Sequence, residues 1–142
     1  LPHGEGFGLP IFEAAYSGLP EVCVGWSGQM DFLCDENKKE NFYNVGFDIN
    51  PVQEEVVWDG VVIKESMWAY AREQSSKYKM RECYNDILKN TGFVSKSKQY
   101  AKSLHERFSE KNMYERFINN VYPMEKIEKA KQDVEDLLSD LL

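Results

Sequence analysis

The sequence predicts an α/β fold that is rich in helices in its second half. A glycine-rich turn at residues 3–8 runs into a short helical segment and then into an apolar run, which is the order of elements in an α/β unit. Residues 42–63 are rich in the β-branched and aromatic side chains that strands favour. From Glu65 onward, apolar residues recur at helical spacing. We therefore divide the chain into three regions: residues 1–64, a helical region over residues 65–122, and a terminal amphipathic helix over residues 123–142.

The first helix is expected over residues 10–17. Pro10 suits the first helical position, because the backbone N–H that proline lacks has no intrahelical partner there. Gly18 suits the helix end, because glycine readily adopts the left-handed conformation of a C-terminal cap. Residues 21–25 then predict a short buried strand, and residues 29–33 a helical turn.

The middle of the chain predicts two strands, over residues 42–49 and 56–63. An Asn-Pro pair at positions 50–51 separates them, and an Asp-Gly pair at positions 59–60 indicates a turn or bulge within the second. We interpret the tryptophans of this region as packing aromatics, with a sugar platform as the alternative; they are Trp58 and Trp68.

The region after Glu65 predicts a helix that ends near residues 90–92. Its apolar face is imperfect and consists of Met67, Ala71, Tyr78, Cys83 and Ile87. Two further helices are expected over residues 95–107 and 111–121.

Pro123 separates the last of these helices from a terminal segment with a heptad-like apolar seam. The seam follows alternating spacings of three and four residues and consists of Ile127, Ala130, Val134, Leu137 and Leu141, with Leu138 beside it. It lasts about two heptads, which is too short to assign a coiled coil. Self-association and packing within the protein both remain open for this helix.

A candidate ligand site lies at the beginning of the chain, where glycines alternate with larger residues. Glycine permits close approach of the backbone to a ligand. The unpaired N–H groups at the start of a helix, together with the helix dipole, can bind a diphosphate. Glu5 precedes this helix start, and Glu13 lies about one turn into the helix. A glutamate at that position also stabilises a helix through its dipole, so Glu13 has a purely structural alternative.

These residues resemble a known site. The segment Glu5-Gly-Phe-Gly-Leu-Pro-x-x-Glu13-Ala, followed by Gly-Leu-Pro, resembles the nucleotide-sugar site of GT-B glycosyltransferases, in particular retaining family 4 (glycosyl transferases group 1). The segment Trp26-Ser-Gly-Gln-Met-Asp-Phe-Leu33 is similar to the Ser-Gly-x-x-Asp-Phe segment of that family. The resemblance implies that the chain is the C-terminal portion of a Rossmann-like donor-binding domain, with residues 1–64 as a partial nucleotide-sugar-binding region.

The family also implies roles for individual residues. Glu13 matches the glutamate that accepts hydrogen bonds from the donor ribose, a task that suits an ionised carboxylate. Glu5 matches the catalytic glutamate beside the transferred sugar, which orients the sugar and supports positive charge at its anomeric carbon. The turn between them holds sugar and phosphates through its backbone and consists of Gly6, Phe7, Gly8 and Leu9. The implied activity is retaining transfer of a hexosyl group from a nucleoside diphosphate sugar to a sugar or other hydroxyl acceptor.

In this family the acceptor-binding domain and the basic residues that hold the donor diphosphate lie before the motif. The chain begins with Leu1 instead of methionine, so we expect the C-terminal part of a longer enzyme that is inactive without its N-terminal domain. The terminal helix would then pack on that missing domain, and a homodimer could cover the exposed sheet edge. The alternative is a non-catalytic helical interaction module that keeps a relict donor-site motif.

The composition of the chain limits the classes of partner, the cellular location and the cofactors that we expect. The chain of 142 residues has a formal net charge of −7 and no basic stripe, which argues against nucleic acid and anionic membranes. It has no apolar run of the roughly 20 residues that a membrane span needs and no signal peptide, so a cytoplasmic location is expected. The three cysteines are widely spaced, which suits reduced thiols. We expect neither a metal nor a cofactor, because metal-ligand spacings and an Asp-x-Asp pair are lacking.

Overall fold

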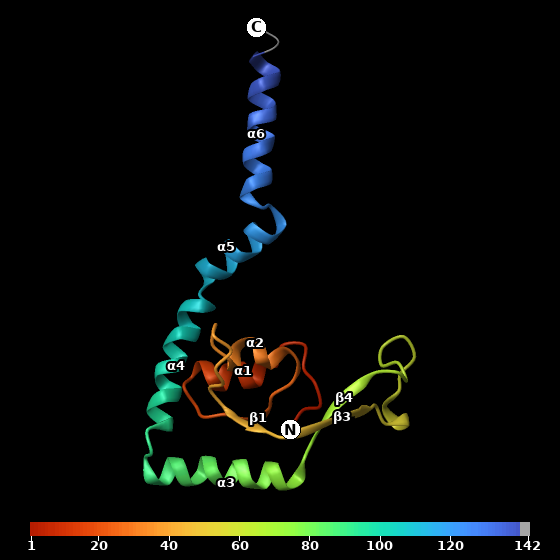
Figure 1. Cartoon of the computed structure of the whole chain (residues 1–142), viewed down its shortest axis with the longest axis vertical. Coiled ribbons are helices and arrows are strands. Elements are labelled where there is room, and N and C mark those ends of the chain that lie inside the picture. The colour runs from red at the N-terminus through yellow and green to blue at the C-terminus, as the bar shows by residue number, and fades with distance from the viewer. Residues whose placement is uncertain (140–142) are drawn as a thin grey trace. The chain divides into compact units, whose positions relative to one another are not determined.

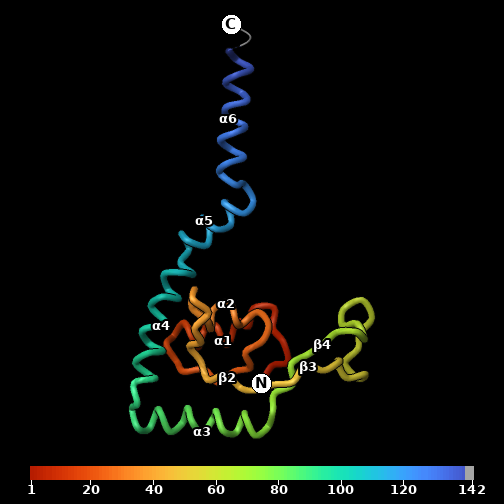
Figure 2. Tube along the Cα trace, viewed as in Figure 1, coloured from red at the N-terminus to blue at the C-terminus, as the bar shows by residue number. Residues whose placement is uncertain are grey.

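The computed structural model describes residues 1–139 and divides the chain into two compact units, Leu1–Ser103 and the residues from Leu104 onward. Helix α4 (Phe93–Arg107) runs across the boundary. Figures 1 and 2 trace the order of the elements. The fold class is mixed α/β: small strands and short helices form the N-terminal part, and four helices, α3 to α6, follow the last strand of the described residues.

The first unit contains a small parallel sheet between helices. Strand β1 (Val22–Val24) pairs with β2 (Tyr43–Val45), with Val22 opposite Tyr43. Helix α3 (Glu73–Lys89) packs against both strands. Figure 1 shows two short helices on the opposite side of the strands, α1 (Leu9–Tyr16) and α2 (Met30–Leu33).

A second sheet is antiparallel and joins the same core. Strand β3 (Phe47–Pro51) pairs with β4 (Met67–Ala71), and the short 3₁₀ helix η2 (Glu54–Val56) lies in the connection between them. In residues 1–139 each sheet has two strands, and a wide parallel sheet of the Rossmann type is not among them. Fully buried side chains from both sheets form a core cluster of Val24, Val45 and Ala69.

Helix α1 ends as the sequence predicts. Gly18 has φ 81°, and its N–H donates to the carbonyl of Ala15 at 3.0 Å, while the N–H of Leu19 donates to Ala14 at 3.1 Å. This pair of bonds is the Schellman motif, which needs a left-handed residue at the first position after the cap. A Cβ at Gly18 would also lie 3.2 Å from the backbone of Lys98, so glycine fits both the conformation and the space.

The prediction of one strand over residues 42–49 is wrong, because the chain changes sheets at Gly46. Residues before it form β2 and residues after it form β3. The N–H of Gly46 donates to Ser75 Oγ at 2.8 Å, and its carbonyl accepts from the N–H of Arg72 at 2.8 Å. The start of α3 therefore satisfies the backbone groups that a continuous strand would have paired elsewhere.

The predicted strand over residues 56–63 is also wrong. Helix η2 ends at Val56, and the following residues fold back on themselves, with the N–H of Trp58 donating to the carbonyl of Val62 at 3.0 Å. Gly60 has φ 74° at the centre of this turn. The Asp-Gly signal was therefore a chain reversal, which divides the apolar run into two arms too short to form the expected strand.

The helix expected from Glu65 onward begins only at Glu73. Residues Met67–Ala71 form strand β4. The spacing of their apolar residues also fits a helix. These residues form a strand instead, because pairing with β3 satisfies the backbone hydrogen bonds of both strands. The end of α3 is as predicted: Asn90 has φ 49° and Gly92 has φ 87°.

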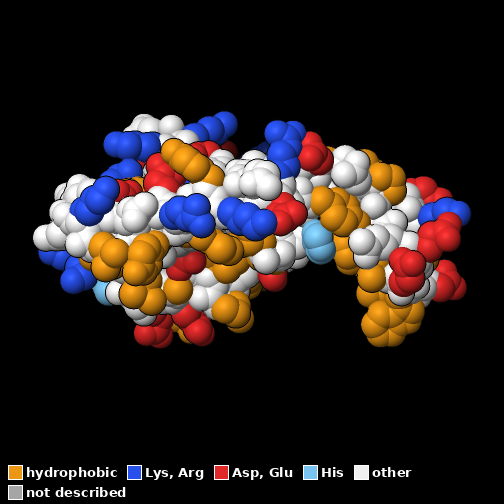
Figure 3. Space-filling view, turned by 90° about the horizontal axis from the view of Figure 1, so that it is seen from below, with side chains coloured by type: hydrophobic (Ala, Val, Ile, Leu, Met, Phe, Trp, Pro, Cys, Tyr) orange, Lys and Arg blue, Asp and Glu red, His pale blue; other side chains and the backbone are white. Residues whose placement is uncertain are grey.

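The first unit also exposes large hydrophobic side chains, and hydrophobic side chains show as orange clusters on the face seen in Figure 3. Surface of this kind is typical of a region that another polypeptide covers. These residues lie on α3 and in the loop between β3 and β4, and they include Trp58, Val61, Ile63, Tyr78, Met80, Tyr84, Ile87 and Leu88.

The second unit is helical. Helix α5 (Glu110–Val121) begins at Ser109, whose side chain accepts a hydrogen bond from the N–H of Asn112, and α6 (Met124–Ser139) follows Pro123. Both helices, like α4, were predicted, and the expected seam residue Leu141 lies outside the described residues. Within residues 1–139, the structure contains no helix with the length and apolar character needed to cross a membrane.

Candidate functional site

The glycine-rich turn ends at Gly8, which is the N-cap residue of α1. Gly8 has φ 86° and ψ 57°, a left-handed conformation that strains residues with a side chain. Helix α1 starts without a side-chain cap, and within residues 1–139 no group accepts a hydrogen bond from the N–H of Gly8 or Leu9. The start of α1 therefore presents unpaired donors and the positive end of a helix dipole, which suit an anion.

One glutamate of the motif precedes this helix start in the sequence, and the other follows it. Glu5 is half-buried in the turn, and Glu13 is exposed on α1. Neither carboxylate makes a hydrogen bond or an ion pair with another residue in the described part of the chain. Both are therefore free to accept hydrogen bonds from a ligand, which is what hydroxyl groups of a sugar or ribose require.

The turn is joined to a segment more than twenty residues away. Ser27 Oγ donates to the carbonyl of Glu5 at 2.7 Å and accepts from the N–H of Glu5 at 3.3 Å. The N–H of Gly28 donates to the same carbonyl at 2.9 Å. The structure thus brings together the two segments that the sequence singled out separately.

This contact is so close that only glycine fits at position 28. A Cβ on Gly28 would lie 2.0 Å from the carbonyl oxygen of Gly6 and 2.7 Å from that of Glu5. Both atoms belong to the backbone, so they cannot move aside as a flexible side chain would. The second segment, which forms the 3₁₀ helix η1 (Ser27–Gln29), therefore lies directly on the turn.

A buried polar side chain anchors this segment to β1, and a half-buried one joins the end of β1 to β2. Gln29 is 0% exposed, and its Nε2 donates to the carbonyl of Val24 at 3.0 Å. Its Oε1 has no hydrogen-bond partner in the described residues. The N–H of Gly25 donates to Asn44 Oδ1 at 3.0 Å. No role was predicted for Gln29 or Asn44, although a glutamine within the motif next to an apolar strand was an available signal.

Phe7 anchors the turn through contacts with two other aromatic side chains. Its ring centroid lies 5.2 Å from that of Phe12 and 5.0 Å from that of Phe32, and the latter two rings meet edge to face at 5.2 Å. Phe7 therefore packs its side chain against α1 and α2. Leu9, by contrast, is 62% exposed, so its side chain adds little to this packing.

An open hollow of about 470 Å³ adjoins the second segment. Four residues of the segment Trp26–Leu33 line it, Ser27, Gly28, Met30 and Asp31, together with three residues for which no role was predicted, Cys34, Lys38 and Glu40. Glu40 Oε1 also accepts from Asn44 Nδ2 at 2.6 Å. Neither Glu5 nor Glu13 lines this hollow.

Glu21, Cys23 and Cys83 are buried or half-buried titratable groups of the first unit. Desolvation by burial raises the pKa of Glu21 from 4.5 to about 7 and that of Cys23 to about 11. Burial also raises the pKa of Cys83. The two thiols are free and mainly protonated near neutral pH, so both are unreactive cysteines. Among the residues described, no group of three His, Cys, Asp or Glu side chains could hold a metal ion.

The two tryptophans considered as sugar platforms have different surroundings. Trp68 stacks on His3 with ring centroids 5.5 Å apart, and His3 pairs its backbone carbonyl with the N–H of Ala69 at 3.0 Å. Trp68 is therefore a packing residue that holds the N-terminal segment against β4. Trp58 is 67% exposed in the turn after η2.

No family model, curated protein or solved structure matches this chain.

Proposed function

We propose that this chain is the donor-binding segment of a retaining GT-B glycosyltransferase, which transfers a hexosyl group from a nucleoside diphosphate sugar to a hydroxyl acceptor. The contact of Glu5 with Ser27 and Gly28 carries the proposal. It joins the two segments whose residues resemble those of family 4. If the two segments resembled the family by chance alone, there would be no reason to expect them to contact each other in the fold.

The proposed donor spans the start of α1. Its diphosphate accepts hydrogen bonds from the unpaired N–H groups of Gly8 and Leu9. Glu13 accepts from the ribose hydroxyls, a charge-assisted interaction worth about 1.5–3 kcal/mol. Glu5 faces the sugar and stabilises positive charge at the anomeric carbon as the bond to the diphosphate oxygen breaks.

The reaction needs groups that residues 1–139 do not supply. We propose that an acceptor-binding domain and basic side chains for the diphosphate complete the active site, in a cytoplasmic enzyme. The parallel pair β1–β2 with helices on both sides supports this proposal, because a Rossmann-like domain also has helices on both faces of parallel strands, and further parallel strands would extend the pair. Such partners would cover the apolar side chains exposed on α3.

Calorimetric titration tests the proposal. The protein is titrated with UDP, GDP and ADP and with their glucose and mannose conjugates. We expect one nucleotide to bind and Glu13→Ala to weaken it at least about tenfold. Glu128→Ala, which removes an exposed helical glutamate from α6, is the matched control and leaves affinity unchanged. Absence of binding by the folded, full-length wild-type protein, with its N-terminal domain, would refute a functional donor site.

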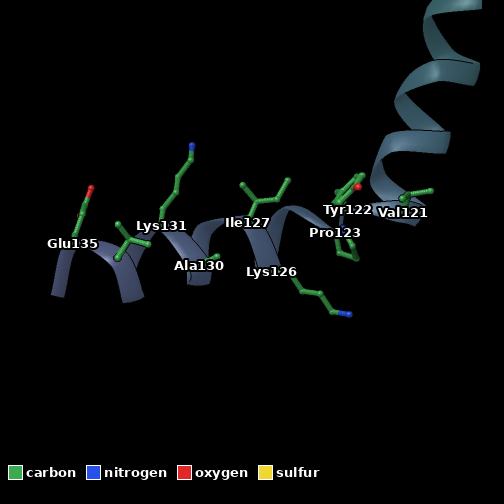
Figure 4. A pocket seen from close by; sticks show the side chains of 9 residues that line it. Val121, Tyr122, Pro123, Lys126, Ile127, Ala130, Lys131 and Glu135 are labelled. Carbon is green, nitrogen blue, oxygen red and sulfur yellow. The ribbon is translucent and has the colours of Figure 1, made fainter. Parts of the chain in front are cut away.

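A second candidate function is association through the terminal helices, with the donor motif as a relict. An apolar hollow lies where α5 meets α6, and Figure 4 shows Ile127 and Lys131 pointing to one side of α6 and Lys126 to the other. Val134, Leu137 and Leu138 continue this surface and are more than half exposed. Sedimentation velocity over a range of concentrations tests for a homodimer, and Val134→Asp should dissociate it while Glu128→Ala does not. A monomer at every concentration would rule out this dimer.

A further inference from the structure

Ser27 has a backbone conformation that its side chain makes costly. Its φ is 70°, in the left-handed region where residues other than glycine are strained. Glycine at position 27 would relieve this strain, yet the chain has serine there and glycine only at the next position, Gly28. A strained conformation at such a position calls for a use of the side chain that offsets its cost.

The side chain of Ser27 holds one residue in particular. Its hydroxyl both donates to the carbonyl of Glu5 and accepts from the N–H of Glu5. The distances are 2.7 Å and 3.3 Å. A single hydroxyl thus binds both backbone polar groups of the residue that carries the proposed catalytic carboxylate.

Glu5 needs this support because its neighbours give it little. Gly4 and Gly6 flank it, and glycine leaves the backbone free to rotate on either side. Gly6 is exposed, and a Cβ built on it would meet no atom within 4 Å. Besides the hydroxyl of Ser27, the backbone of Glu5 is held by the N–H of Gly28 at 2.9 Å.

We propose that Ser27 is a positioning residue that aims the Glu5 carboxylate at the sugar of the donor. The proposal rests on the donor-binding function proposed above. Glu5 faces the sugar, whereas Glu13 and the start of α1 face the nucleotide. Ser27 therefore sets how strongly the site prefers a nucleoside diphosphate sugar over the bare nucleoside diphosphate.

Two substitutions separate positioning from stability. Ser27→Gly and Ser27→Ala both remove the hydroxyl, but only glycine relieves the backbone strain, so Ser27→Gly should melt several degrees higher than Ser27→Ala. We expect both variants to lose about tenfold in the ratio of sugar-conjugate affinity to nucleoside diphosphate affinity. Affinity for the bare nucleoside diphosphate should stay within about twofold of wild type.

A double-mutant cycle with Glu5→Ala completes the test. Glu5→Ala should lose the same preference, and adding Ser27→Gly should change it no further, because the hydroxyl acts through Glu5. Amide hydrogen exchange without ligand should show faster exchange at Glu5 in Ser27→Gly than in wild type. If Ser27→Gly keeps the wild-type affinity ratio, or if affinity follows melting temperature in both variants, the positioning role is wrong. If the full-length wild-type protein binds neither ligand, the donor-site function fails and the positioning role fails with it.

Discussion

Replacing Gly28 by alanine should separate the two segments of the candidate site. The new Cβ would lie 2.0 Å from the carbonyl oxygen of Gly6, whereas an ordinary carbon–oxygen contact is about 3.3 Å or more. The segments must therefore move apart by roughly 1 Å, which breaks the hydrogen bonds that Ser27 and Gly28 make with Glu5. Each is worth about 0.5–1.5 kcal/mol, so the loss is about 2–4 kcal/mol.

Thermal unfolding followed by circular dichroism measures this loss. About 2–4 kcal/mol lowers the melting temperature of a unit of this size by roughly 10–25 °C. Gly6→Ala is the matched control, because it adds the same methyl group to the same turn where no atom lies within 4 Å. That variant should melt no lower than wild type. If Gly28→Ala melts within about 2 °C of wild type, the close contact between the segments is wrong.

Two other predictions concern Glu21 and Tyr43, which lie outside the glycine-rich turn. Because the pKa of Glu21 is about 7 in the folded state and 4.5 is its ordinary value, folded protein binds this proton more tightly, and stability falls as pH rises from about 4.5 to about 7. After a discount for the remaining exposure of Glu21, this loss in the free energy of unfolding is about 1–3 kcal/mol. Melting curves at pH 5 to 8 measure it, and Glu21→Gln should abolish this pH dependence. Glu36→Gln, in an exposed loop, is the control and should keep the pH dependence of the wild type. Tyr43→Phe removes a 2.8 Å hydrogen bond to Asp86 Oδ2 and should cost about 1–3 kcal/mol in urea unfolding; an unchanged midpoint would show that water replaces the hydroxyl.

Local signals in the sequence were sufficient for the elements that local interactions determine. Gly18 ends α1 because a left-handed residue is required there, and this requirement is visible in the sequence. The helices after residue 92 were also predicted within a few residues, since their boundaries coincide with glycine, serine and proline signals.

Non-local pairing decided the elements that were predicted wrongly. Strand β4 forms because β3 is available as an antiparallel partner, with Phe47 opposite Ala71. A window of sequence around residue 69 contains helical spacing but no information about that partner. The same limit applies at Gly46, where a run that looks like one strand is divided between two sheets by bonds to Ser75 and Arg72.

In the candidate site too, the sequence was sufficient to select the residues but not to predict the non-local contacts between them. Sequence pattern selected Glu5, Glu13 and the glycine turn, together with the segment that contains Ser27. It gave no means of seeing that Ser27 holds the backbone of Glu5, because a contact across 22 residues leaves no periodic trace. The buried amide of Gln29 was missed for a related reason, since its partner is a backbone carbonyl that any residue could supply.

The glycines of the site meet different physical needs, and Gly6 is the informative exception. Gly8 is required by its φ of 86°, and Gly28 by the lack of space for a Cβ. Gly6 has no positive φ, and a Cβ built on it would meet no atom within 4 Å. The folded chain alone therefore does not need glycine there, whereas a ligand that approaches the backbone of the turn does. Gly6→Ala should match or exceed wild-type stability by up to about 1 kcal/mol, because alanine reduces the entropy of the unfolded chain. The same variant should weaken donor binding in calorimetric titration, and donor affinity equal to that of wild type would show that the ligand does not contact the turn at this position.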